Sequence, residues 1–415
     1  MSALADYWRG FARMGRDARL WVACWALISF GGFGVQSVLL NLYLLRLGYD
    51  PKYIGLLQGL GQLMSVIMCL PGVAIGRKIG HRNAMLASAP LVVLSTVIIL
   101  LSENLPQVVR PTWLVGSWML GWTGIPIFLV NSDPCIMRVT TDDTRRYAFA
   151  SQAAAVAAAA FGGALIAGWL PEFLAIKLGV SLANSTPYRT ALILVPIAYT
   201  IFTIVLISAR REPALSLEET TSSTIGSPLR ILVFIGILMF IMRLGSGVTA
   251  FFNVYLDDAL AVPTFRIGAL MGVAELVPIV LAMLIPLFLS RWGAGRTLGG
   301  AAICTALAMI VLALVPNWYT VGTAYVIAAV AWRVHFSTRV LFSQQAVESR
   351  WRGVVAACVE MGSSLGMVAA TSVGGYLIVT VGYHFLFLAA AGVSLLSVAM
   401  LSMYLYRVRK TAYSG

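Results

Sequence analysis

The chain has 415 residues, of which 60% are hydrophobic and 11% charged, and its mean hydropathy is +0.88. This composition excludes a soluble core with a wetted surface and places the chain in lipid. The formal net charge is +13, but the basic residues stand in short clusters between long apolar runs, so membrane topology explains them better than nucleic-acid binding.

Apolar runs of about 20 residues can cross a bilayer as helices. In the first half we expect such helices at 20–47, 53–75, 83–101, 112–138, 147–170 and 188–208. In the second half we expect them at 228–256, 265–289, 297–315, 318–343, 353–379 and 385–406. The sequence therefore predicts an all-α polytopic membrane protein with twelve transmembrane helices.

The longest polar stretch lies between these two sets, at 209–227, and mixes both charge signs with serine and threonine. Such a composition is typical of a linker. We therefore expect a six-helix bundle at 1–208, a cytoplasmic linker at 209–227 and a second six-helix bundle at 228–415. If the N-terminus is inside, most Lys and Arg residues fall in the inner loops, which places both termini in the cytoplasm.

Two short basic turns occupy matching places in the two halves. The first is PGVAIGRKIGHR at 71–82 and the second is LFLSRWGAGR at 287–296. With one inserted residue, the second half also repeats a spaced set of residues from the first. Asn41, Tyr43, Gly55 and Gly80 are matched by Asn253, Tyr255, Gly268 and Gly293. The repetition indicates an internal duplication, which is common among secondary transporters.

These features resemble the major facilitator superfamily, and the resemblance covers nearly the whole chain. It rests on the two sets of six helices, the linker, the passage from Leu42 to Gly59, and the turn at 71–82, which is similar to the family's GxLADRxGRR signature. The resemblance implies alternating-access transport of a small organic solute by a monomer in the plasma or inner membrane. The turn departs from the signature because alignment on Gly80 places Arg77 where the family has an acidic residue.

The resemblance also implies a gating role for the turn that contains Gly72, Arg77, Gly80 and Arg82. In the family, an arginine here pairs with an acid near the inner end of the fourth helix, which in this chain is Asp133. Simple anchoring by positive residues at the cytoplasmic surface explains the same arginines equally well.

Ionisable residues inside membrane spans are costly, at roughly 3 kcal/mol each, and are seldom present without a use. Arg243 and Arg333 lie near the middle of two predicted helices that, in the family, line the central cavity. Because a guanidinium matches carboxylate or phosphate oxygens, we expect the two arginines to bind substrate. Glu275 could join this site, carry a proton together with Asp133, or simply pair with one of the arginines. We expect His335 to be a core residue.

The first-half wall of the cavity is expected to be neutral and polar. Gln36, Asn41, Asn131 and Trp122 are its candidate substrate-binding residues. Amides in transmembrane helices serve equally often as contacts between helices, so that alternative stays open.

No catalytic cluster, phosphate-binding loop or metal-ligand spacing is present in the sequence, so we expect neither enzymatic activity nor a cofactor. The expected partners are a small-molecule substrate, possible coupling protons and the lipid bilayer. Two other functions remain open for the same fold. A lipid or lysolipid flippase would have a cavity open to the bilayer, and a non-transporting receptor or scaffold would bind without flux.

Overall fold

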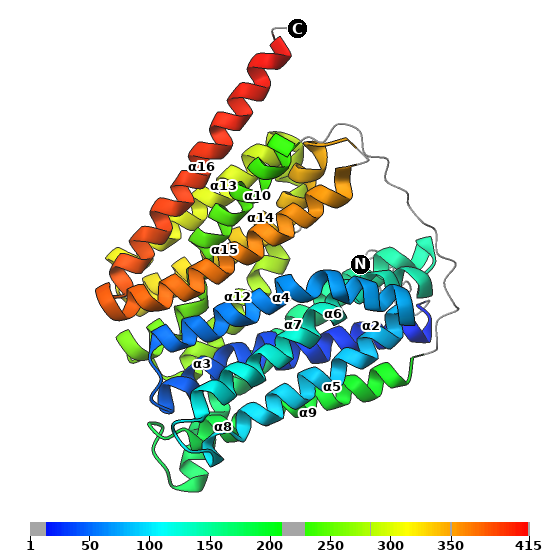
Figure 1. The fold of residues 1–415 in the computed structure, drawn as a ribbon. Coiled ribbons are helices and arrows are strands. Elements are labelled where there is room, and N and C mark those ends of the chain that lie inside the picture. Colours follow the sequence, from blue (N-terminus) through cyan, green and yellow to red (C-terminus); the bar gives the residue numbers. More distant parts are fainter. Residues whose placement is uncertain (1–13, 210–228, 283, 349–350, 414–415) are drawn as a thin grey trace, which may run out of the picture. The chain divides into compact units, whose positions relative to one another are not determined.

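The computed structural model describes residues 14–209, 229–282, 284–348 and 351–413, and the regular structure of these residues is helical, without a β-strand. The first predicted span is a helix with a π-helical middle, formed by α2 (Arg16–Ile28), η1 (Ser29–Gln36) and α3 (Ser37–Arg46). The other helices of this half are α4 (Pro51–Ile79), α5 (His81–Leu100), α6 (Arg110–Val139), α7 (Asp142–Leu178), α8 (Thr186–Leu192) and α9 (Leu194–Ile207), as Figure 1 shows.

The second half begins with α10 (Leu229–Gly247), which continues through η3 (Val248–Phe251), α11 (Phe252–Val254) and the π-helical η4 (Tyr255–Ala259). The helices that follow are α12 (Thr264–Ala282), α13 (Ile285–Leu314), α14 (Trp318–Gln345), α15 (Arg352–Val381) and α16 (Tyr383–Tyr413). Each of the predicted helical segments therefore corresponds to a helix in the described part of the chain.

Among the described residues, ten helical segments are long and apolar enough to cross a membrane. They match all the predicted spans except those at α12 and α14. The α14 helix carries Arg333, His335 and Arg339 along its length, which lowers its hydropathy. The chain is thus a multi-pass membrane protein, while the total of twelve spans and the cytoplasmic position of the termini stay predictions.

The boundary between the predicted helices at 265–289 and 297–315 is confirmed, because the backbone leaves the helical conformation at Gly293, between these two ranges. A second interruption lies further towards the N-terminus. Helix α12 ends at Ala282, and α13 starts at Ile285 with a proline in its first turn, a position that suits proline because the first helical N–H groups have no partner. The segment α13 joins two helices across Gly293, which has φ 75° and ψ 166°, so the basic turn at 287–296 separates two helices as predicted.

Backbone conformation supports the internal duplication. Residues with positive φ occur at the ends of corresponding helices in the two halves. They form three pairs, which are Gly48 with Ala261, Gly80 with Gly293, and Gly179 with Gly382. A positive φ costs little for glycine and about 1–2 kcal/mol for other residues. The glycines of the two basic turns thus share a conformational role.

We expect Gly293→Ala to lower the free energy of unfolding by about 1 kcal/mol, because alanine is strained at φ 75°. A Cβ atom at Gly293 would meet no other atom within 4 Å, so backbone strain is the main effect. Gly300→Ala is the matched control, since Gly300 lies in the same helix, also has open space and has no positive φ. Thermal unfolding in detergent measures both, and equal melting temperatures would contradict the prediction.

The described residues divide into two compact units, and the division falls inside α4 and inside α12. Unit one contains the described residues of 14–49, 64–209 and 263–276, and unit two those of 50–63, 229–262 and 277–413. Residues 210–228, which include nearly all of the predicted linker, lie outside the described part. The predicted domain boundaries therefore stay predictions.

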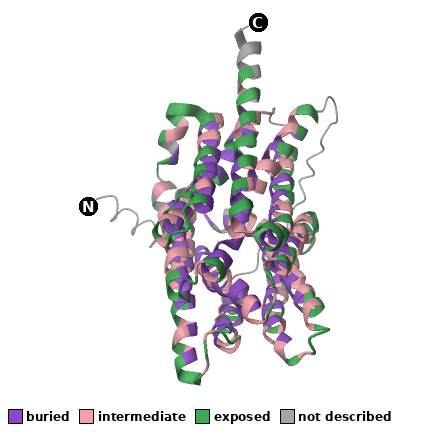
Figure 2. Cartoon of the chain, turned by 90° about the vertical axis from the view of Figure 1, so that its left-hand side faces the viewer, coloured by how far each residue is buried: buried purple, intermediate pink, exposed green. Residues whose placement is uncertain are grey.

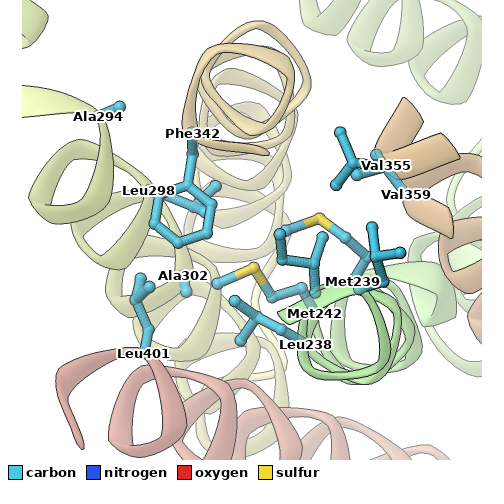
Figure 3. Close-up of a cluster of buried hydrophobic side chains, with 12 residues drawn as sticks. Leu238, Met239, Met242, Ala294, Leu298, Ala302, Phe342, Val355, Val359 and Leu401 are labelled. Atoms are coloured by element: carbon cyan, nitrogen blue, oxygen red, sulfur yellow. The ribbon is translucent and has the colours of Figure 1, made fainter. Parts of the chain in front are cut away.

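Each unit has its own apolar core, and Figure 2 shows buried and exposed residues on different sides of the same helices. In unit one, Phe128 of α6 packs edge-to-face on Phe202 of α9. In unit two, Figure 3 shows Leu238, Met239 and Met242 of α10 among apolar side chains of α13, α14, α15 and α16. In lipid the hydrophobic effect does not drive helices together, so the van der Waals contacts of this close packing hold the five helices together.

Candidate functional site

The most unusual polar contacts of unit two surround Arg243 of α10. Its guanidinium carbon lies 3.8 Å from the ring centroid of Trp332 on α14. The ring of Trp332 in turn stacks on His335, with 5.2 Å between centroids and 18° between planes. Trp332 and His335 are three residues apart, so they lie on one face of α14. The three side chains form a continuous stack, which we call the arginine stack.

Arg243 lies in the middle of a span and is only partly exposed. Among the residues that the structure describes, no acidic side chain forms an ion pair with it. The close approach of Gly366 on α15 fixes its position, because a Cβ atom at Gly366 would lie 2.9 Å from the Cβ of Arg243. An arginine held by an aromatic face keeps its N–H groups available for an anion.

A second arginine, Arg339, lies two turns beyond Trp332 on α14. Its two terminal nitrogens donate to Ser363 Oγ at 2.6 Å and to Glu360 Oε2 at 2.9 Å, both on α15. Its guanidinium carbon lies 4.6 Å from the centroid of Phe336. Arg339 was not among the site residues predicted from the sequence. The signal that could have identified it is the spacing of Trp332, His335 and Arg339, which places all three on one face of α14.

A small cavity of about 10 Å³ lies beside the arginine stack, between α10, α13, α14 and α16. Its polar lining consists of Trp332, His335, Ser246, Thr305, Ser394 and Ser397. His335 is buried, and its Nε2 atom has no hydrogen-bond partner within the described part of the chain. A cavity of this volume has room for about one water molecule. His335 is thus a core residue, as expected, but with one free nitrogen.

Two further predicted residues of the second half are Arg333 and Glu275. Arg333 is partly exposed, and its side chain forms no hydrogen bond or ion pair among the described residues. Glu275 lies on α12 in unit one, whereas the arginine stack belongs to unit two, and Glu275 has an interaction partner. The roles proposed for Arg333 and Glu275 therefore stay predictions.

In unit one, Asn131 of α6 is completely buried and links three helices. Its Nδ2 donates to the backbone oxygens of Gly72 at 3.0 Å and Ile127 at 2.8 Å, and its Oδ1 lies 2.7 Å from Nδ1 of His81. Both ends of the amide are occupied by these contacts. The arrangement favours the interhelical role of Asn131, which the sequence left open beside substrate binding.

The remaining candidates of the first-half wall are separated along the helices. Gln36 Oε1 accepts a long hydrogen bond of 3.5 Å from Tyr199 and borders a second cavity of about 10 Å³. Asn41 is buried and has an interaction partner. The rings of Trp122 and Trp118 pack edge-to-face with 6.1 Å between their centroids. Neither indole nitrogen has a hydrogen-bond partner among the described residues. Substrate binding by these residues stays a prediction.

The turn between α4 and α5 is held by packing on its neighbours. A Cβ atom at Gly72 would lie 3.2 Å from the Cα of Ile127, and Gly80 adopts φ 87°. Arg82 is buried and donates to the carbonyl of Ile207, in the last turn of α9, at 2.6 Å. A cation at a helix C-terminus is favourable. Arg77 is exposed, and the side chain of Asp133 lies outside the described part of the chain, so the predicted Arg–Asp pairing stays untested.

Comparison with known proteins gives one family. The sequence profile of the Major Facilitator Superfamily matches residues 22–357 and 235–414. No curated protein matches the chain. Among solved structures, the POT family transporter PepTSo is 12% identical with a TM-score of 0.73, over 96% of this chain and 99% of its own.

Two further structures have the same fold. The nucleoside transporter NupG is 14% identical with a TM-score of 0.66, over 94% of this chain and 99% of its own. The human organic anion transporter MFSD10 is 13% identical with a TM-score of 0.61, over 93% of this chain and 99% of its own. At these identities the likeness shows a shared fold.

Proposed function

Because the chain belongs to the Major Facilitator Superfamily, we propose that it is a secondary transporter that moves a small organic anion across the cell membrane by alternating access. In such transporters the substrate site lies near the middle of the bilayer, at the interface of the internal repeats. The protein would act as a monomer, since one chain supplies both repeats. Arg243 is the observation that carries the choice of an anion.

The charge of Arg243 favours an anionic substrate. A guanidinium inside a membrane span is costly without a negative partner. Arg243 has the aromatic face of Trp332 as its support but no acidic partner in the described residues. A carboxylate or phosphate group of a substrate would accept its hydrogen bonds in a bidentate manner. The site thus favours anions over neutral sugars and cations.

Ligand-induced thermal stabilisation of the purified protein tests this proposal. We expect organic anions to raise the melting temperature of the wild-type protein, whereas neutral sugars and cationic drugs leave it unchanged. Arg243→Ala should abolish the shift, because the group that binds the anion is removed. Arg230→Ala is the matched control, since Arg230 lies exposed on the same helix, and it should respond like the wild type.

Stabilisation by neutral or cationic ligands alone, with Arg243→Ala responding like the wild type, would contradict the anion proposal. Stabilisation by lysolipids alone would favour a flippase, and binding without flux in vesicles would favour a receptor or scaffold.

Proton coupling through Glu275 and Asp133 is a separate part of the proposal. Flux that is the same at acid and neutral pH, and unchanged by Glu275→Gln, would exclude a role of Glu275 in coupling.

A further inference from the structure

The ion pair between Arg339 and Glu360 is asymmetric. The Arg339 side chain is 5% exposed, whereas the Glu360 side chain is 57% exposed. The contact uses a single carboxylate oxygen and a single guanidinium nitrogen, at 2.9 Å. Among the described residues, the Nε of Arg339 has no hydrogen-bond partner. The arginine is therefore fixed and buried, and the carboxylate is attached to it at one point only.

The two partners would respond differently to separation. A buried guanidinium without an anion is destabilising, so Arg339 requires a negative partner. A carboxylate with more than half of its surface exposed holds an ion pair weakly. An acid in a span is expected to face a water-filled cavity and not lipid. Glu360 can thus leave Arg339 cheaply if another anion takes its place.

Arg243 belongs to the same group of charges. Its guanidinium lies on Trp332, the ring centroid of Trp332 is 6.1 Å from that of Phe336, and Phe336 carries the guanidinium of Arg339. Arg243, Arg339 and Glu360 all lie in unit two, on the packed helices α10, α14 and α15. The group contains two guanidiniums but a single carboxylate among the described residues. A ligand with two acidic groups, or with one doubly charged group, complements the two arginines better than a monoanion.

We propose that Glu360 is an internal counter-anion, which occupies Arg339 while the site is empty and is displaced when a transported dianion binds to Arg243 and Arg339 together. This inference rests on the proposed function and narrows its substrate to dicarboxylates or phosphate monoesters. Arg339 thereby becomes the second substrate-binding arginine of this half. When the dianion leaves, Glu360 returns to Arg339, so the buried guanidinium always has a negative partner.

The test is titration calorimetry of the purified protein with a monocarboxylate, a dicarboxylate and a phosphate monoester. The wild type should prefer one of the two dianions. Glu360→Gln should bind that dianion roughly two- to fivefold more tightly, because a competitor with the strength of an exposed ion pair has been removed. A purely structural ion pair cannot produce this gain, since its loss would leave affinity unchanged or weaken it. Dicarboxylate and phosphate monoester are distinguished by which of the two binds.

Three variants complete the design. Glu103→Gln is the matched control, because Glu103 forms an ion pair with Arg189 in unit one at 3.0 Å, and it should bind like the wild type. The double variant Arg339→Gln/Glu360→Gln leaves no buried charge unpaired, so it should fold, and it should lose the preference for dianions. Glu360→Asp shortens the competitor and should also tighten binding.

Two failures are distinguishable. If no anion binds to the wild type, the proposed function is wrong. If anions bind through Arg243 but Glu360→Gln and the double variant show wild-type affinity and preference, the function stands and the counter-anion role of Glu360 is overturned.

Discussion

Gly268→Leu is expected to separate α12 from α7 and to lower the free energy of unfolding by roughly 3 kcal/mol or more, at or above the upper end of the usual cost of overpacking. A Cβ atom at Gly268 would lie 2.6 Å from the Cα and 2.8 Å from the N of Gly168. These are backbone atoms of a long helix, so no side-chain rotation can relieve the clash. Thermal unfolding in detergent measures the loss.

The same kind of crossing occurs in unit two, where a Cβ atom at Gly55 of α4 would lie 3.1 Å from the Cα of Gly375 on α15. Gly55 and Gly268 are matched positions of the internal duplication, so Gly55→Leu should have a similar effect. Because the transport that we propose needs correctly packed helices, both variants should also lose most of their flux in vesicles.

Gly300→Leu is the control for both variants, because a Cβ atom at Gly300 would meet no other atom within 4 Å. Its melting temperature should stay near that of the wild type. Wild-type stability of Gly268→Leu would show that α7 and α12 do not pack at this crossing.

Trp332→Ala should destabilise the protein by about 2–4 kcal/mol, since it removes a partly buried ring together with its contact to a cation. The indole supports Arg243 on one helix and stacks on His335 along its own. Without it, the guanidinium is no longer held in one orientation, so anion-induced stabilisation should weaken as well. Thermal unfolding with and without the organic anions measures both effects.

Trp332→Phe is the informative control, because phenylalanine keeps an aromatic face for Arg243 and loses only part of the ring. We expect it to retain most of the stability and a measurable response to anions. An identical, complete loss in both variants would argue against support of Arg243 by the aromatic face.

The positions of the helices could be predicted from the sequence alone. Apolar runs such as 188–208 and 385–406 gave helices at Thr186–Ile207 and Tyr383–Tyr413, because hydropathy and length are local properties that the bilayer converts directly into spans. Gly80 and Gly293 could be matched from their spacing, and both have positive φ. The predicted boundary between 289 and 297 is confirmed by the non-helical backbone of Gly293, because a glycine beside basic residues marks a turn in the sequence itself.

The partners of the polar side chains were decided only by the tertiary structure. The sequence suggested Arg333 and Glu275 as companions of Arg243, whereas its contact with Trp332, which lies on a helix far along the chain, became visible only in the structure. Asn131 was considered for the substrate, but its amide joins α6 to Gly72 and His81.

The physical reason is the same in both cases. The sequence determines that a residue lies inside a span, since this depends on its immediate neighbours. Which side chain it contacts depends on how helices that are distant in sequence rotate and cross. Close approaches between helices, such as that of Gly366 to Arg243, set this rotation and crossing. The sequence alone therefore determined a multi-helix membrane protein with duplicated halves. Only the packing of the helices decided that Arg339 pairs with Glu360 and that Arg243 has no acidic partner among the described residues.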